Sequence, residues 1–429
     1  MEKIDVVIVG AGLAGLSCAY ALADSGLMVV VIERGDFPGS KNVTGGRIYL
    51  EPVRRMLPGL WDEAPLERHV TREILTLLGD ENATSIAHDS DRRRQPPYPS
   101  YTILRAKFDR WLSEKVGEKG VFVIPQKRVD DLLVEGKRVI GVRAGDEEIP
   151  AEVVVAADGV LSFLAEKAGL RKPFRPEHFA VGYKEIIRLD KEKIEDRFNL
   201  GPDEGAAQLF VGSITKEMMG GGFLYTNQES LSLGMVVGLG SLNTREPREE
   251  VYPLLDAFKA RPEVQRLIHG GETVEYSAHL IPEGGIQTKP QLFTDGMLLV
   301  GDAAGFGLNM LITVRGMEYA MISGVLAAEA IRKAKEKGDF SASALSHYEG
   351  LVNRSVILKD LETFRRSPDI LKNPRLFSRY PQFVGDLFEK LMAIDETPKD
   401  KLSSIAWREF RKTLLNLRGV RDIWSLRGI

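Results

Sequence analysis

The chain has 429 residues, with 58 basic against 61 acidic side chains and a formal net charge of −3. This balance excludes the basic composition typical of nucleic-acid-binding proteins, and the length allows two or three packed domains. Cys18 is the single cysteine, which excludes an intrachain disulfide, a cysteine-ligated iron–sulfur cluster and CxxC redox chemistry within this chain. We therefore expect any redox centre here to be an organic cofactor, and Cys18 to be a small buried residue.

The first predicted unit is residues 4–33, IDVVIVGAGLAGLSCAYALADSGLMVVVIE, which is typical of a strand, a glycine turn, a helix, a second strand and an acid. Gly10, Gly12 and Gly15 form GxGxxG, in which they allow a tight turn, approach to a pyrophosphate and close helix packing, respectively. The helix N-terminus supplies N–H groups and a positive dipole to phosphates. Glu33 is placed to accept hydrogen bonds from ribose hydroxyls, so the unit predicts a bound dinucleotide.

The remaining elements divide the chain into three parts. Strand and helix patterns alternate through residue 165 and predict an α/β layer with parallel pairing. Residues 80–100 are polar and rich in proline, which predicts a loop. Apolar runs without interleaved helices predict a mostly antiparallel second domain, with strands at 179–189, 207–211, 222–226 and 231–237. A long helix is expected over 316–336, and helices from about residue 341 to the end.

Three further segments indicate that the bound dinucleotide is FAD. VVVAADG (153–159) ends a buried strand on Asp158 and Gly159, and MLLVGDAAG (297–305) ends another on Gly301 and Asp302, whose carboxylate suits the hydroxyls of a ribityl chain. ILRAKFDRWL (103–112) places Arg105 before an amphipathic helix, as a candidate contact for the flavin side chain or phosphate. Acid–glycine turns after strands are common, but in this order they indicate FAD.

The tail from residue 399 to 429 is basic, with eight Lys or Arg against three acids. Its apolar residues recur at helical spacing and predict an amphipathic helix: Ala406, Phe410, Leu414 and Leu417. Two interpretations stay open. The helix either packs on its own protein, or it docks to an acidic partner or to anionic lipid head groups.

The motif order resembles the glutathione-reductase-type FAD fold, in the branch with a single dinucleotide site. A second fingerprint is incomplete, because GLGSLN (238–243) ends in Asn, so the usual domain that docks NAD(P)H is missing. Longer segments resemble the FixC family, the quinone-oxidoreductase subunits associated with electron transfer flavoproteins. They are KNVTGGRIY (41–49), SYTILRAKFDRWL (100–112), GGFLYTNQESLSLGMVVGL (221–239), SAHLIPEGG (277–285), GDAAGFGLNMLITVRGMEYAMISG (301–324) and LKDLETFRRSPDILKNPRLFSRYP (358–381).

This resemblance implies the domain organisation. We expect an α/β FAD-binding domain over 1–77, 101–166 and 291–345. An inserted antiparallel-sheet quinone or substrate domain is expected over 78–100 and 167–290, and a C-terminal helical region with the basic tail over 346–429.

The resemblance also implies the site. The expected FAD-binding residues are Gly10, Gly12, Ala14, Gly15, Glu33, Arg34, Lys41, Asn42, Gly45, Gly46, Arg105, Val129, Asp158, Gly159, Gly301, Asp302, Thr313, Val314, Arg315 and Gly316. The quinone head group is expected at Gly284 and Gly285 of the EGG motif, where bare backbone accommodates a flat ring.

An apolar entrance for the quinone tail is expected from Phe223, Leu224 and Tyr225, with Met218 and Met219 just before them. No catalytic side chain is required besides the flavin. Tyr225, Tyr276 and His279 are candidate proton donors, although His279 is better explained as a structural histidine. No metal site is expected.

The implied function is FAD-dependent transfer of electrons from an electron transfer flavoprotein to a membrane quinone, plausibly in an electron-bifurcating complex. The implied partners are the alpha and beta subunits of that flavoprotein and a FixX-like ferredoxin subunit that carries a [4Fe–4S] cluster. The alternatives are a geranylgeranyl-type isoprenoid reductase, a flavin hydroxylase and a redox-silent flavoprotein scaffold. No nucleic-acid partner is expected.

The expected location is cytoplasmic and peripheral, on the inner face of the cell membrane. Glu2 and Asp5 argue against a secretory signal peptide. The longest apolar span, residues 296–314, is interrupted by Asp302 and Asn309 and is a poor candidate for a membrane-spanning helix.

Overall fold

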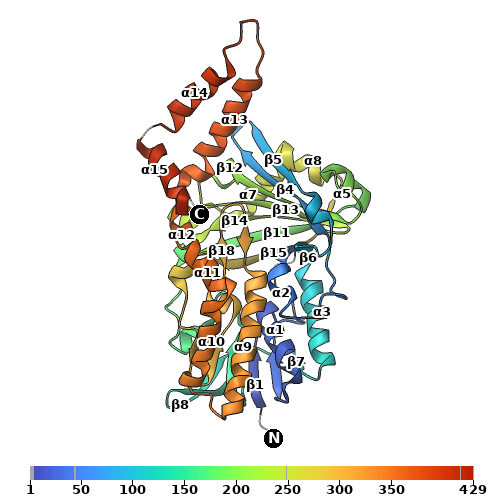
Figure 1. Ribbon diagram of the computed structural model, residues 1–429, viewed down its shortest axis with the longest axis vertical. Coiled ribbons are helices and arrows are strands. Elements are labelled where there is room, and N and C mark those ends of the chain that lie inside the picture. The colour runs from blue at the N-terminus through green and yellow to red at the C-terminus, as the bar shows by residue number, and fades with distance from the viewer. Residues whose placement is uncertain (1–3, 43–44, 248, 416, 429) are drawn as a thin grey trace.

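The computed structural model describes residues 4–42, 45–247, 249–415 and 417–428. Two layers follow one another along the long axis in Figure 1, and a helical arm projects from the end opposite the N-terminus. The first layer is built on an eight-stranded sheet, in the order β16-β17-β10-β1-β2-β7 with β8 and β9 attached through β10. The bounds of its strands are β1 Ile4–Val9, β2 Val29–Ile32, β7 Phe122–Ile124, β8 Asp131–Glu135, β9 Arg138–Ala144, β10 Glu147–Ala156, β16 Phe293–Thr294 and β17 Met297–Leu299.

The centre of this sheet is parallel, because β1 pairs in parallel with both β10 and β2. Its strands are continuous apolar runs, and Val6, Val7 and Ile8 are fully buried, as expected where both faces are covered. Helix α9 (Met317–Lys337) lies against α1 (Leu13–Leu22). A Cβ on Gly324 would collide with the carbonyl oxygen of Ala14, so only glycine allows this approach.

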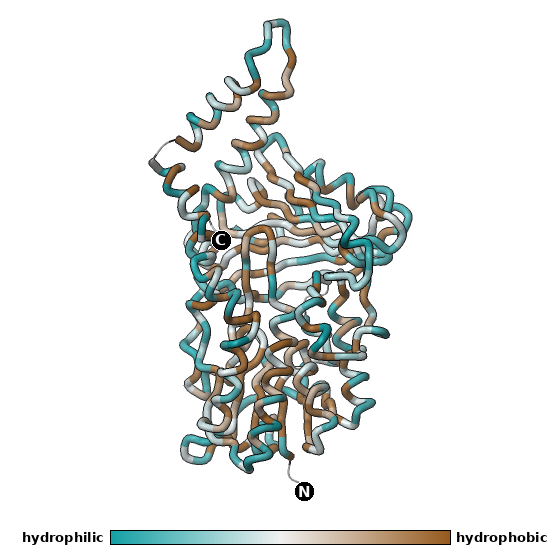
Figure 2. Tube along the Cα trace, in the orientation of Figure 1, coloured by the Kyte–Doolittle hydropathy of each residue, from teal (hydrophilic) through white to brown (hydrophobic). Residues whose placement is uncertain are grey.

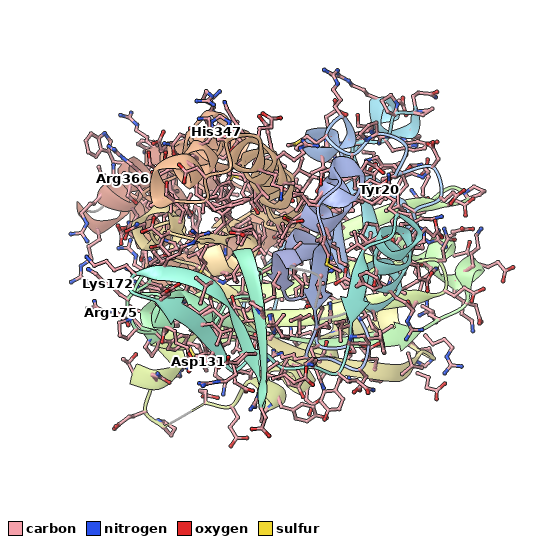
Figure 3. All side chains as sticks on the ribbon, turned by 90° about the horizontal axis from the view of Figure 1, so that it is seen from below. Tyr20, Asp131, Lys172, Arg175, His347 and Arg366 are labelled. Atoms are coloured by element: carbon pink, nitrogen blue, oxygen red, sulfur yellow. The ribbon has the colours of Figure 1, made fainter. Side chains whose placement is uncertain are left out.

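Figure 3 views this layer end-on, and its labels mark opposite sides of it. His347 lies on α10 (Ala342–Arg354) and Asp131 on β8, at the other face of the molecule. Tyr20 of α1 lies to the right in this view. Cys18 lies on the same helix. Cys18 is fully buried, which confirms the prediction of a small buried residue. Burial raises the pKa of its thiol to about 12.

The second layer is a nine-stranded sheet in the order β15-β11-β14-β13-β12-β4-β6-β3, with β5 paired to β4. Its pairings are antiparallel except for β12 with β4, which run in parallel. The bounds are β3 Gly46–Tyr49, β4 His69–Leu78, β5 Ala83–Asp89, β6 Ser100–Ile103, β11 Phe179–Arg188, β12 Glu204–Gly212, β13 Gly220–Thr226, β14 Ser230–Gly238 and β15 Glu272–Pro282. The predicted antiparallel sheet is confirmed.

Two expectations about this sheet need correction. The predicted loop over 80–100 contains strand β5, because Ala83–Asp89 pairs antiparallel with β4 along its whole length. In addition, β3 and β4 both belong to this sheet, although the expected boundaries put them in the FAD-binding domain. The chain therefore crosses between the layers more often than the motif spacing indicates.

One face of the second sheet is covered by three helices, α5 (Lys191–Phe198), α7 (Val251–Ala260) and α8 (Pro262–Ile268). Their apolar residues form one buried cluster with Leu224, Leu231 and Leu233 of β13 and β14. Since side chains alternate along a strand, the neighbouring residues of β13 point to the opposite face, toward the first layer.

The C-terminal region is helical, as predicted: α11 Val356–Thr363, α12 Ser367–Ile370, α13 Arg379–Met392, α14 Leu402–Thr413 and α15 Leu417–Ser425. Its first part packs on the second sheet, where Ile370, Leu371 and Phe377 form a buried cluster with Val211. Helices α13 and α14 form the projecting arm, along which hydrophobic and hydrophilic residues alternate in Figure 2. No helix of the described residues is long and apolar enough to cross a bilayer.

Candidate active site: a cavity between the two layers

A cavity of about 1180 Å³ lies between the two layers. This exceeds the ~300–1,000 Å³ of an ordinary small-molecule site, so it has room for a dinucleotide and part of a second molecule. Most of the predicted site residues line it: Gly10, Gly12, Ala14, Glu33, Arg34, Lys41, Asn42, Gly45, Gly46, Arg105, Val129, Asp158, Gly159, Asp302, Thr313, Val314, Arg315, Gly316, Phe223, Tyr225 and His279. Gly15, Gly301, Gly284 and Gly285 are not part of the lining.

The glycine motif forms the junction of β1 and α1 that its spacing predicts. Gly10 has φ +107°, and a Cβ there would collide with the carbonyl oxygen of Ala157. A Cβ on Gly15 would strike the carbonyl oxygen of Gly10, whereas Gly12 faces open space on the cavity. No side chain caps α1 at Gly12, so the first N–H groups of the helix remain available to a phosphate.

Glu33 is held in place by two backbone donors. Its Oε2 accepts from Ala11 N–H at 2.8 Å and its Oε1 from Gly35 N–H at 2.6 Å. Each carboxylate oxygen retains a second lone pair, and the residue lines the cavity. The fixed carboxylate and the uncapped helix together fit the ribose and pyrophosphate of a dinucleotide.

Arg105 belongs to a buried network that the sequence analysis missed. Its Nε and Nη2 donate to the carboxylate of Asp109 at 2.9 and 2.7 Å, and Asn42 donates to the same fully buried Asp109. Asp109 thereby fixes two predicted cofactor contacts at once. The separation of Arg105 and Asp109 by four positions in α3 (Arg105–Glu118) is the signal that identifies the pair.

The predicted site residues Asp158 and Asp302 differ in the hydrogen bonds that their carboxylates accept from the protein. The Asp158 oxygens accept from Ser162 Oγ at 2.8 Å and Leu164 N–H at 3.3 Å, so this side chain organises the turn into α4 (Phe163–Lys167). Asp302 has no such turn partner in the described hydrogen bonds. Burial raises its pKa, and the nearby Arg105 guanidinium opposes that rise, so Asp302 is the better candidate for ribityl hydroxyls.

Lys184 of β11 is a second residue that the sequence analysis missed. It lines the cavity, is 1% exposed, and its Nζ donates to the carbonyl oxygen of Gly45. Burial and then Arg105 hold its pKa well below the usual lysine value, while Glu275 opposes them. A buried, weakly basic amine therefore lies beside Gly45 and Gly46, where the resemblance implies the flavin.

The segment before α9 closes the same side of the cavity. Thr313 to Gly316 line it, and Gly316 is the residue before the first turn of α9. Arg315 Nε donates to Glu318 at 2.6 Å, and its Nη1 donates to Asp360 of α11. Arg315 thus ties the cavity wall to the C-terminal region.

Another part of the cavity wall carries apolar and aromatic side chains. Phe223 and Tyr225 of β13 stack with their ring centres 5.3 Å apart and line the cavity with Leu209, Val211 and Met219. The C-terminal region adds Leu371 and Phe377, which the sequence analysis did not assign to the site. Leu224 and Met218 were expected here, but both belong to the buried cluster on the other face of the sheet. Alternation along β13 turns Leu224 away from the cavity, whereas Met218 lies in the turn before this strand.

The remaining predicted residues lie in different surroundings. Tyr276 is 69% exposed on the edge strand and is not part of the lining. His279 lines the cavity, and burial lowers its pKa, with Arg105 and Arg34 acting in the same direction. Gly284 and Gly285 are buried directly after Glu283, which does line the cavity.

Two helices, α14 and α15, stand in place of the single amphipathic helix that was predicted for the tail. Ala406, Phe410 and Leu414 are half-buried on or beside α14, which packs against α13, whereas the side chain of Leu417 lies outside the description. The cation Arg408 pairs with Asp400 at 2.6 Å. Within the described ranges, no cluster of three His, Cys, Asp or Glu could hold a metal ion.

Comparisons with known protein families match three segments of the chain. Residues 5–170 match the family model described as FAD dependent oxidoreductase, residues 179–281 match "ETF-QO, ubiquinone-binding", and residues 367–427 match "ETF-QO/FixC family C-terminal domain". Leu209, Phe223 and Tyr225 lie in the second match, and Leu371 and Phe377 in the third. All three matched segments therefore contribute to the cavity.

Similar proteins extend over almost the whole chain. The probable electron transfer flavoprotein-quinone oxidoreductase YdiS of Escherichia coli K12 is 45% identical, with 97% of each chain covered. FixC of the same organism is 43% identical over 96% of this chain and 95% of its own. Among solved structures, a geranylgeranyl bacteriochlorophyll reductase-like protein of Thermoplasma acidophilum shares the fold, with a TM-score of 0.73, 21% identity, and 99% and 100% of the chains covered. The chain therefore belongs to the ETF-QO/FixC family and is an FAD-dependent oxidoreductase.

Proposed function

We propose that this protein passes electrons from an electron transfer flavoprotein through FAD to a membrane quinone. The observation that carries the proposal is that a single cavity joins a dinucleotide end, at Gly12 and Glu33, to an apolar end, at Phe223 and Tyr225. When bound, FAD supplies the redox chemistry, because it exchanges one or two electrons. The chain's own residues bind, orient and insulate the reactants.

The quinone is proposed to occupy the apolar end. The stacked rings of Phe223 and Tyr225, with Leu371 and Phe377, offer apolar surface to an isoprenoid tail. We propose that the head group lies toward Gly284 and Gly285, where the adjacent Glu283 reaches the cavity wall. The names of the similar proteins support this reading, since YdiS is described as a probable quinone oxidoreductase.

We propose a partner subunit of the FixX type for the iron–sulfur cluster. The one cysteine of this chain is buried in α1 and cannot ligate a cluster. Electrons would then arrive from the alpha and beta subunits of an electron transfer flavoprotein, directly or through that ferredoxin-like subunit. An electron-bifurcating donor is compatible with this order.

The basic tail, residues 399–429, is proposed as the surface that meets the ferredoxin-like subunit, because such proteins are commonly acidic. Several of its cations are exposed, among them Arg411, Lys412 and Arg418. Removal of residues 399–429 should weaken co-purification with the cluster subunit at least tenfold and leave flavin content unchanged. Undiminished complex formation would reject this role for the tail.

Peripheral attachment to the inner face of the cell membrane is the proposed location. Near the tip of the arm, Met392, Ile394 and Leu402 are 72%, 81% and 57% exposed beside Lys399 and Lys401. Apolar and basic side chains together suit an anionic lipid surface. Co-sedimentation with anionic vesicles should be lost when these three apolar residues become serine.

One experiment tests the proposed reaction. Reduced electron transfer flavoprotein should bleach the flavin absorbance of the purified protein, and a short-tailed menaquinone analogue should restore it. Rapid saturation of a prenyl lipid without quinone activity would favour an isoprenoid reductase instead. A flavin that neither partner can reduce or reoxidise would indicate a redox-silent scaffold.

A further inference from the structure

Glu283 differs from the other two glutamates of the cavity lining, Glu33 and Glu73, in its hydrogen-bond partners. Glu33 accepts from two backbone N–H groups, and Glu73 accepts from Arg47 at 2.6 and 2.7 Å and from Arg93 at 2.5 Å. Glu283 instead has one described side-chain partner, the neutral amide of Asn309, whose Nδ2 lies 3.5 Å from its Oε1. Its carboxyl group is therefore weakly bonded, without a cation to hold its charge.

The backbone around Glu283 is firmly held. Its N–H donates to the carbonyl oxygen of His178 at 2.8 Å, and β15 ends at the preceding Pro282. On the other side, Ser367 donates to the carbonyl oxygen of Asn309, and Leu311 N–H donates to Asn309 Oδ1 at 2.9 Å. The carboxyl group is thus positioned on the cavity wall by elements from both the second layer and the C-terminal region.

Burial penalises the charged form of Glu283 and raises its pKa to about 7, while the Asn309 amide slightly opposes that rise. The titratable groups on the surrounding elements either bond to other residues or favour their neutral form. Asp369 of α12 accepts from Gln287 at 2.9 Å and from Lys372 at 3.1 Å. Burial lowers the pKa of His178 and so favours its neutral form.

A proton donor is needed at this position if the proposed function holds. Two electrons and two protons convert a quinone to its quinol. Electrons that arrive one at a time from a flavoprotein or an iron–sulfur cluster bring no protons, so both protons must enter from water through the protein. A carboxylic acid that stays protonated near neutral pH can deliver one of them.

We propose that Glu283 is the acid that protonates an oxygen of the quinone as that quinone is reduced. In this step the Glu283 O–H bond breaks, a quinone O–H bond forms, and the carboxylate left behind takes a proton from water. The inference rests on the proposed quinone reduction and adds its proton donor. It also gives the first residue of the EGG motif a role separate from that of the two glycines.

The test uses the full-length protein loaded with FAD and reduced before mixing. Flavin reoxidation is followed by stopped flow with two oxidants, a short-tailed menaquinone analogue and ferricenium, which takes electrons without protons. E283Q keeps the shape of the side chain but has no acidic proton, and E283D keeps the acid. E177Q is the matched control, because Glu177 is an exposed glutamate outside the cavity.

At pH 6.5, E283Q should be reoxidised by the quinone about 100-fold more slowly than the unmodified protein, in line with general acid catalysis. E283D should recover part of that rate, and E177Q should match the unmodified protein. With ferricenium, all variants should react alike. The quinone rate of the unmodified protein should fall as pH rises above about 7, and E283Q should lose this dependence.

Two results would overturn the role of Glu283: a quinone rate in E283Q equal to that of the unmodified protein, or an equal loss of rate with ferricenium. Failure of the proposed function would look different. In that case the unmodified reduced protein would react with ferricenium but with no quinone at any pH.

Discussion

The two ends of the cavity are built in different ways. The dinucleotide end depends on backbone: Gly10 and Gly15 have no room for a Cβ, and Glu33 is bound by main-chain N–H groups. The apolar end depends on side chains from distant strands and from the C-terminal region, such as Phe223, Tyr225 and Phe377. The first end is thus fixed by a short contiguous motif, whereas the second exists only after the two layers pack.

The largest loss of bound flavin and of folded protein should come from a side chain added at Gly15. G15V places a branched side chain against the carbonyl oxygen of Gly10, and such overpacking costs about 3 kcal/mol. The variant should lose bound flavin and most folded protein, measured by the ratio of absorbance at the flavin band to that at the protein band and by thermal unfolding. G117A is the control, because a Cβ on this exposed helical glycine meets nothing. Normal flavin content in G15V would contradict the packing described.

Smaller effects are expected on β13, where substitutions on the two faces of the strand should change different properties. F223A removes apolar surface from the cavity, so the KM for a quinone analogue should rise about tenfold while flavin content stays unchanged. L224A removes a fully buried core side chain instead and should cost about 2 kcal/mol of unfolding free energy. If L224A raised the KM and F223A only lowered stability, the orientation of this strand would be wrong.

The smallest effect concerns Lys184. Its pKa is held well below the usual value in the folded state, so the unfolded chain binds more protons and stability rises with pH. Between the folded and unfolded pKa values, the unfolding free energy of the unmodified flavin-free protein should gain about 1.4 kcal/mol per pH unit relative to K184M. Denaturant titrations at several pH values measure this slope. The exposed Lys172, tested as K172M, should show no such difference.

The same contrast explains what the sequence could predict. GxGxxG, Glu33 and the antiparallel strands follow local patterns, and the structure places them as expected. Lys184 and Glu283 carry no local pattern of their own, because their role depends on burial against other segments. Asp109 is marked only by its spacing of four positions from Arg105. Leu224 was misassigned because an apolar run does not reveal which alternate residues face a cavity.

The most direct test of the account is an experimental structure with FAD and a short-tailed quinone analogue bound. The account predicts that the pyrophosphate lies at the N-terminus of α1 and that the isoalloxazine lies near Gly46 and Lys184. It also predicts that the quinone occupies the same cavity, against Phe223 and Tyr225. An isoalloxazine sealed off from that apolar end, or a nicotinamide stacked over it in productive geometry, would contradict the account.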